Sequence, residues 1–123
     1  MDVLIVEDEL LVSRSLVELL EHHGHTARVA DDAVEALEMM QHARYRPTVI
    51  VLDLILPNMS GRTFLELKSA DPAIADIPVV VFTGSATRDL PKGASRLLTK
   101  PTNEEALLAA LQKAVDERAH RAA

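Results

Sequence analysis

The sequence predicts an α/β protein in which helices cover both faces of a parallel β-sheet. Short apolar runs of strand-forming residues alternate along the 123-residue chain with segments whose apolar residues recur at helical spacing. The short runs are apolar at successive positions, as expected of strands that are buried on both faces. Alternating strands and helices of this kind favour parallel strands that are joined by helical crossovers.

The expected strands cover residues 3–6, 26–30, 49–52, 78–82 and 96–99. The expected helices cover residues 9–23, 33–40 and 63–69, and a last helix opens with a capping box at residues 102–105. Gly24 stands where a glycine cap would end the first helix. No linker, repeat or low-complexity segment interrupts the pattern, so one domain is expected over residues 1–123.

One segment breaks the alternation of strands and helices. Residues 84–95, "GSATRDLPKGAS", lack an amphipathic stripe and contain Pro91 and Gly93. Proline removes a helical hydrogen bond, and glycine loses more conformational freedom than other residues when it enters a helix. We therefore expect a shortened helix or a loop between the fourth and fifth strands.

Composition and charge exclude several classes of function. The formal net charge is −6 and the basic residues form no stripe, which argues against direct nucleic-acid binding. The chain has no cysteine, so disulfides, thiolate metal sites and cysteine nucleophiles are excluded. The start "MDVLIVEDE" is no signal peptide, and no apolar run reaches membrane-spanning length. A soluble cytoplasmic protein without membrane insertion is expected.

Polar side chains gather at the predicted carboxyl ends of the strands. Glu7 and Asp8 follow the first strand, Asp53 follows the third, and Thr83 and Lys100 end the fourth and fifth. Sites in open parallel sheets form at this edge, so these side chains should converge. Clustered carboxylates repel each other, and a hard cation such as Mg²⁺ relieves that repulsion. The set suits a phosphoryl group that is held by metal, lysine and hydroxyl and accepted by a carboxylate.

Each of these residues also has a simpler interpretation. Asp53 could cap the turn in "PNMSG", and Glu7 and Asp8 could be acids favoured at the start of a helix. Thr83 could be an ordinary strand-end residue and Lys100 a solvated lysine. The functional interpretation is preferred because all five residues are expected at the same edge of the sheet.

Four motifs in order resemble a known family. "LIVEDE" ends the first strand, "VLDLILPNMSG" covers the third, "VVVFTG" the fourth and "LLTKP" the fifth. The sequence is similar to the receiver domain of bacterial two-component response regulators. The resemblance implies a flavodoxin-like open five-stranded parallel sheet with strand order 2-1-3-4-5. It also implies a receiver domain over residues 1–123 without an output domain.

The resemblance assigns roles to individual residues. Asp53 corresponds to the phosphoacceptor and Asp8 to the direct Mg²⁺ ligand. Glu7 corresponds to the acid that acts through a metal-bound water, and the backbone carbonyl of Ile55 corresponds to a further metal ligand.

The remaining assignments concern the phosphoryl group. Lys100 corresponds to the residue that contacts the phosphoryl oxygens, and Thr83 to the switch hydroxyl that moves toward them. The Lys100–Pro101 bond corresponds to the family's cis peptide, and cis bonds are essentially confined to X-Pro.

Two features depart from the usual receiver pattern, and Ile55 has a further kinetic meaning. Leu97 replaces an aromatic residue that normally swings inward with the threonine, which puts that relay in doubt. Thr83 and Lys100 are only 17 positions apart, about one helical turn fewer than usual, so the usual fourth-helix dimer is not assumed. Partner contacts are expected on the first helix or on residues 84–95. The bulky Ile55 lies beside the expected path of water and predicts a long-lived phosphoaspartate.

The predicted function is phosphorylation-dependent signalling rather than enzymatic turnover. A histidine kinase or histidine phosphotransfer protein would donate the phosphoryl group, and the chain would signal by protein contact as a diffusible regulator, shuttle or sink. A degenerate receiver that acts as a binding module remains an alternative, as does an Asp-nucleophile phosphatase. Against the phosphatase, Ile55 occupies the place of its second acid. Flavodoxin-type cofactor binding is disfavoured because no Gly-rich loop follows the first strand.

Overall fold

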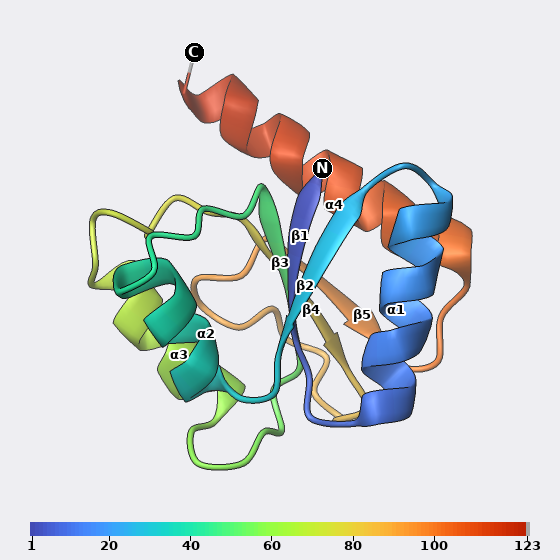
Figure 1. The fold of residues 1–123 in the computed structure, drawn as a ribbon, viewed down its shortest axis with the longest axis horizontal. Helices are drawn as coiled ribbons and strands as arrows, with labels where there is room; N and C mark the ends of the chain where they lie inside the picture. Colours follow the sequence, from blue (N-terminus) through green and yellow to red (C-terminus); the bar gives the residue numbers. More distant parts are fainter. Residues whose placement is uncertain (123) are drawn as a thin grey trace.

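The computed structural model describes residues 1–122 and contains five strands and four helices (Figure 1). All strands are parallel and lie in the order β2-β1-β3-β4-β5, which confirms the predicted class and strand order. The elements in chain order are β1 (Asp2–Val6), α1 (Leu10–His22), β2 (Thr26–Ala30), α2 (Ala33–Gln41), β3 (Val49–Leu52), α3 (Gly61–Ser69), β4 (Val79–Thr83), β5 (Arg96–Thr99) and α4 (Glu104–Ala122).

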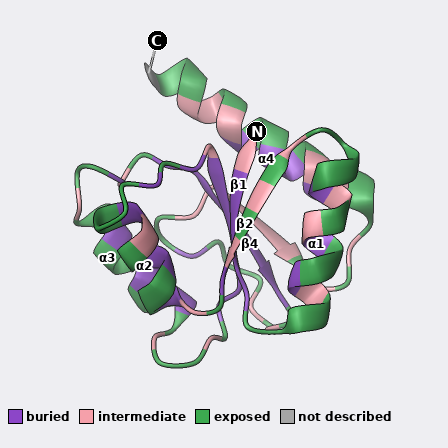
Figure 2. Ribbon diagram, in the orientation of Figure 1, coloured by how far each residue is buried: buried purple, intermediate pink, exposed green. Residues whose placement is uncertain are grey.

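The sheet separates two apolar cores. Helices α1 and α4 cover one face and α2 and α3 cover the other (Figure 1). Alternate strand residues point to opposite faces: Val3 and Ile5 pack on the α1–α4 side, whereas Leu4 and Val6 pack on the α2–α3 side. The central strands are buried along their length (Figure 2). This explains why their sequences are apolar at successive positions.

The helix ends follow local sequence signals with one correction. Gly24 has a φ of 81° just after α1, as the predicted glycine cap requires. The Ser60 hydroxyl accepts a hydrogen bond from the Thr63 amide at 3.1 Å and starts α3. The capping box predicted at residues 102–105 is wrong. The cap is Asn103, whose Oδ1 accepts from the Ala106 amide at 2.7 Å, because α4 begins one residue later than that box requires.

Residues 84–95 form a loop between β4 and β5, as predicted, so the C-terminal helix is labelled α4. The loop packs along α3. The hydroxyl of Thr87 accepts a hydrogen bond from Arg62 at 3.2 Å. Gly93 lies so close to α3 that a Cβ there would be 3.1 Å from Ser69 Oγ. The expectation that the family's usual helix is missing here is confirmed.

The strand order places a crevice at the carboxyl end of the central strands. The chain leaves β1 toward one edge of the sheet and leaves β3 toward the other, and ligands bind at such switch points in open α/β sheets. Backbone hydrogen bonds extend the ladder into this crevice, from Asp53 N to Val6 O and from Glu7 N to Ala30 O, each at 3.1 Å. Within residues 1–122, no helix combines the length and apolar character that crossing a membrane requires.

Candidate functional site

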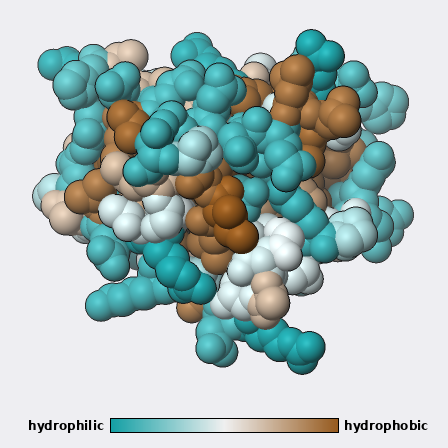
Figure 3. Space-filling model, turned by 90° about the horizontal axis from the view of Figure 1, so that it is seen from below, coloured by the Kyte–Doolittle hydropathy of each residue, from teal (hydrophilic) through white to brown (hydrophobic). Residues whose placement is uncertain are grey.

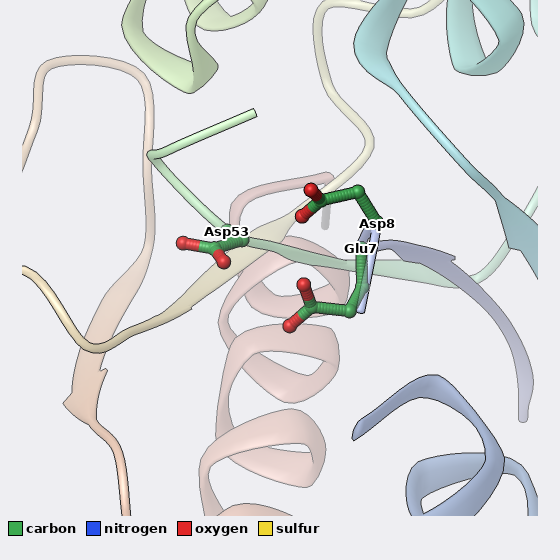
Figure 4. Close-up of side chains that lie close together, drawn as sticks. All are labelled: Glu7, Asp8 and Asp53. Atoms are coloured by element: carbon green, nitrogen blue, oxygen red, sulfur yellow. The ribbon is translucent and has the colours of Figure 1, made fainter. Parts of the chain in front are cut away.

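Three carboxylates meet in the crevice. Glu7 and Asp8 follow β1, Asp53 follows β3, and one oxygen from each lies within 4.8 Å of the others (Figure 4). Glu7 and Asp53 are buried whereas Asp8 is exposed, so the cluster has one side open to solvent. Three oxygen donors without sulfur or imidazole form a set that could hold a metal ion, and they fit a hard divalent cation such as Mg²⁺.

Asp53 contacts two of the other residues that the sequence predicted at this edge. The Thr83 hydroxyl donates a hydrogen bond to Asp53 Oδ1 at 2.8 Å, and the Ile55 amide donates to the same oxygen at 3.2 Å. Lys100 Nζ lies 3.2 Å from Asp53 Oδ2. Each carboxylate oxygen therefore has a donor, as a buried carboxylate requires.

Lys100 bridges two carboxylates, because its ammonium also pairs with Glu7. Burial alone would lower the pKa of Lys100, but the hydrogen bonds with Glu7 and Asp53 outweigh burial and the pKa is raised. Burial also raises the pKa of Glu7, and the hydrogen bond from Lys100 only partly offsets that rise. Lys100 therefore stays cationic at neutral pH.

The Thr83 hydroxyl links Asp53 to the loop that follows β4. It is fully buried and accepts a hydrogen bond from the Ser85 amide at 3.2 Å while it donates to Asp53. The Thr83 carbonyl accepts from the Lys100 amide at 2.9 Å. A displacement of the Thr83 side chain would break or remake the hydrogen bond to Ser85, at the first turn of residues 84–95.

Gly61 fixes the distance between α3 and the Asp53 loop. Its amide donates to Leu54 O at 2.9 Å, and a Cβ at this position would lie 2.6 Å from Asp53 O and 2.7 Å from Leu54 Cα. The motif "PNMSG" predicted a turn but not this contact. A glycine at the first position of a helix, a few residues beyond an acidic strand end, is the signal that could have indicated it.

Two further residues that the sequence singled out, Ile55 and Leu97, occupy defined places. The side chain of Ile55 is 68% exposed while its amide binds Asp53. Leu97 is half-buried and packs against the α2–α3 core. The Lys100–Pro101 peptide is cis, as predicted.

Sequence reasoning also missed Phe82, whose ring lies 5.6 Å from Lys100 Nζ. Phe82 immediately precedes Thr83, and only the fold brings it under Lys100.

Comparisons with known proteins agree with this geometry. The family model of the response regulator receiver domain matches residues 3–112. The response regulator MprA of Mycobacterium leprae (strain TN) is 36% identical over 118 residues, which cover 91% of this chain and 50% of that protein. MprA of Mycobacterium ulcerans (strain Agy99) is 35% identical over 116 residues, covering 89% of this chain and 48% of that protein. The chain thus spans about half the length of these curated relatives.

Solved structures give the same result. A CheY-like response regulator receiver domain protein from Methanospirillum hungatei JF-1 superposes with a TM-score of 0.87 at 26% identity, covering 98% of this chain and 97% of that one. A sensor protein from Polaromonas sp. JS666 gives a TM-score of 0.83 at 28% identity, covering 95% and 97%. The family model, the strand order and the acidic crevice together show that this chain belongs to the response regulator receiver domain family of two-component systems.

Proposed function

We propose that the chain accepts a phosphoryl group on Asp53 from the phosphohistidine of a histidine kinase or a histidine phosphotransfer protein. An Asp53 carboxylate oxygen forms a bond to phosphorus while the P–N bond of the donor breaks. The electron pair of that bond leaves with the imidazole, which takes up one proton from water. The product is an aspartyl phosphate, and the chain signals through protein contacts that depend on it.

One observation carries this proposal. Asp53 is buried, its two oxygens meet the Thr83 hydroxyl and the Lys100 ammonium, and two further carboxylates lie within 4.8 Å. A carboxylate that only capped a turn would need neither the lysine nor the acidic neighbours. The arrangement instead places donors where the negative charge of a phosphoryl group would develop.

The acidic cluster fits the Mg²⁺ that this reaction needs. Asp8 and Asp53 would bind the ion directly, Glu7 through a water molecule, and the Ile55 carbonyl would complete the protein's share. When bound, Mg²⁺ supplies positive charge that offsets both the clustered carboxylates and the phosphoryl oxygens. Asp8 suits a direct ligand because it is the exposed member of the cluster.

Lys100 and Thr83 act on the transferred group. The Lys100 ammonium already reaches an Asp53 oxygen, so a short movement brings it onto a phosphoryl oxygen. The Thr83 hydroxyl would then leave Asp53 and donate to the phosphoryl group, and its bond with the Ser85 amide would transmit this movement to residues 84–95. Since Leu97 replaces the usual aromatic residue, the signal is expected in this loop rather than in an aromatic rotation.

A groove beside the site supports docking of a phosphodonor on α1. The groove has a volume of about 400 Å³ and extends from Leu11 on α1 to Lys100 and the start of α4. Leu10 and Leu11 are 60% and 79% exposed. The end of the molecule at which the strands terminate shows hydrophobic patches among hydrophilic side chains (Figure 3). We expect a helix of the donor to cover these leucines in the cytoplasm, where such donors act.

The lifetime of the aspartyl phosphate should be long. Ile55 follows Asp53 by two residues, its amide binds the Asp53 carboxylate, and its apolar side chain is largely exposed. An apolar group there cannot position a water molecule for attack on phosphorus. The chain is thus proposed to be a phosphoacceptor with slow self-dephosphorylation and not an enzyme with turnover.

Intact mass spectrometry after incubation with acetyl phosphate tests the proposal. Wild type should gain one phosphate in the presence of Mg²⁺ and none in the presence of EDTA, and Asp53→Asn should gain none. Asp89→Asn, in the loop between β4 and β5, is the matched control and should behave as wild type. A missing adduct in wild type with both acetyl phosphate and a phosphohistidine donor would favour a phosphorylation-independent binding module.

A further inference from the structure

We infer that Phe82 is a positioning residue for Lys100. The inference rests on the proposed function, since it concerns how the lysine is aimed during phosphoryl transfer. Lys100 Nζ lies over the Phe82 ring, 5.6 Å from its centroid. This separation is within the range in which an ammonium is attracted to the face of an aromatic ring.

Lys100 needs such support because its stem is flexible. A lysine ammonium is a point charge on four methylene groups, and its geometry is not fixed by a planar fork as in arginine. Asp53 and Glu7 hold the ammonium by two contacts. The face of the Phe82 ring provides a third attraction, and the Lys100 side chain remains 18% exposed. Without the ring, the Lys100 side chain could rotate toward the groove and away from Asp53.

Phe82 itself is held firmly. It is 9% exposed and belongs to the apolar cluster between the sheet and helices α1 and α4, which also includes Leu16 and Leu107. Its strand position is fixed by pairing with Leu98 of β5. The next residue on β4 is Thr83, whose side chain contacts Asp53. Neighbouring positions on one rigid strand therefore support two different partners of the same carboxylate.

Phe82 also lines the groove beside α1, together with Lys100 and Leu11. The ring and the lysine thus both line the groove where a donor helix is expected. A partner that fills the groove would press on the ring and restrict Lys100 further. Phe82 can therefore help to aim Lys100. Leu97 cannot, because it lies on the opposite face of the sheet.

The test compares the two phenylalanines of the chain, Phe82 and Phe64. Phe64 is fully buried in the α2–α3 core, so Phe64→Leu removes a comparable apolar volume without a contact to Lys100. Phosphorylation by acetyl phosphate with Mg²⁺ should be about fivefold slower in Phe82→Leu, the loss expected for one cation–π contact. It should be unchanged in Phe64→Leu and restored in Phe82→Tyr. Phe82→Met replaces Phe82→Leu if the latter does not fold.

A second readout reports the contact directly. The chain has four lysines, Lys68, Lys92, Lys100 and Lys113, so the Lys100 side-chain methylene signals can be assigned by NMR with Lys100→Arg. These signals should show an upfield ring-current shift in wild type and Phe82→Tyr, and the shift should be lost in Phe82→Leu.

The outcomes separate this inference from the proposed function. If wild type takes up phosphate and folded Phe82→Leu matches its rate, the role of Phe82 is wrong and the phosphoacceptor stands. A Lys100 shift that does not change in Phe82→Leu overturns the contact. If wild type takes up no phosphate from any donor, both the proposed function and the positioning role fail, whatever the NMR shift shows.

Discussion

The loop that carries Asp53 and the loop of residues 84–95 both pack against α3, but they differ in how tightly the backbone is enclosed. At Gly61, a Cβ would lie 2.6 Å from Asp53 O, which is closer than atoms can approach. At Gly84, where the second loop begins, a Cβ would meet nothing within 4 Å. The first loop is therefore positioned by backbone contact, whereas the start of the second has room to move.

This difference separates the chemical part of the molecule from the part expected to respond. The Asp53 loop keeps its geometry because backbone atoms of α3 touch it directly. The loop of residues 84–95 contacts α3 through the Arg62–Thr87 hydrogen bond and the packing of Gly93. Local openings occur where buried apolar contacts are few. A rigid acceptor next to a loop whose first residues have room to move is a suitable arrangement for converting phosphorylation into a surface change.

The largest effect is expected at the tight position. Gly61→Ala forces its methyl group against Asp53 O and Leu54 Cα, so the free energy of unfolding should fall by about 3 kcal/mol, at the upper end for overpacking. Phosphorylation by acetyl phosphate should slow as Asp53 is displaced. Chemical denaturation of Gly61→Ala and its matched control Gly84→Ala provides the measurement. Gly84→Ala should leave stability within ~0.5 kcal/mol of wild type. Equal effects at both glycines would contradict the comparison.

Lys68 is a buried residue in the last turn of α3, at the other end of the helix from Gly61. Its side chain is 1% exposed, it donates to Ala75 O at 2.9 Å, and burial lowers its pKa from 10.5 to about 8. Asp76 favours the charged form and Arg118 opposes it. Between these pKa values the unfolded chain binds more protons than the folded protein, so stability should rise with pH.

We expect this rise to reach about 2.5 kcal/mol between pH 7 and 10. Urea unfolding across that range measures it, and Lys68→Met should remove the rise. Tyr45 is the internal check, because burial raises its pKa. At the alkaline end of the range Tyr45 therefore makes stability fall with pH, and it should do so equally in wild type and in Lys68→Met. An identical pH profile for wild type and Lys68→Met would show that Lys68 is not desolvated.

A kinetic effect of intermediate size is expected at Ile55, which projects from the rigid loop. Ile55→Asn should speed hydrolysis of the aspartyl phosphate about tenfold, equivalent to ~1.4 kcal/mol of barrier, because an amide can orient water. The decay of the phosphorylated mass after removal of acetyl phosphate gives the rate. Leu10→Asn, which exposes an amide on α1 instead of two residues beyond Asp53, serves as control. Faster decay in wild type than in Ile55→Asn would contradict the role assigned to Ile55.

The smallest effect is expected in the loosely held loop. Thr87→Val removes the acceptor of the Arg62 hydrogen bond, which is exposed and contributes little to global stability. Trypsin cleavage after Arg88 should become about twofold faster because local opening is easier. Cleavage after Arg118, a residue of α4 that pairs with Asp76, should not change. If Thr87→Val lowers global stability as much as Gly61→Ala does, the two loops are equally integral to the fold.

Much of the fold could be predicted because local signals agreed with the tertiary arrangement. Successive apolar residues such as Val49–Leu52 predicted the buried strands. Pro91 and Gly93 predicted that residues 84–95 form a shortened helix or a loop. The contacts of Asp53 with Thr83 and Lys100 followed from the rule that parallel strands end at one edge.

Other features could not be predicted because they depend on three-dimensional neighbours. Lys68 has an ordinary place on an amphipathic helix, and its burial and its hydrogen bond to Ala75 O become visible only in the folded structure. The proximity of Phe82 to Lys100 arises from the path of the loop after β5, and the direct Glu7–Lys100 pair arises in the same way. Helix α4 starts one residue after the position that the capping box indicated, since Asn103 competes with Thr102 for the same role.

Borohydride reduction of the phosphorylated protein identifies the phosphoacceptor residue, which is proposed to be Asp53. Borohydride converts an aspartyl phosphate to homoserine, and peptide sequencing by mass spectrometry then locates the modified position. Wild type treated with acetyl phosphate and Mg²⁺ should contain homoserine at position 53, and the EDTA control should contain it at no position. Homoserine at Asp8 or at another aspartate, with position 53 unchanged, would contradict the proposal that Asp53 is the acceptor.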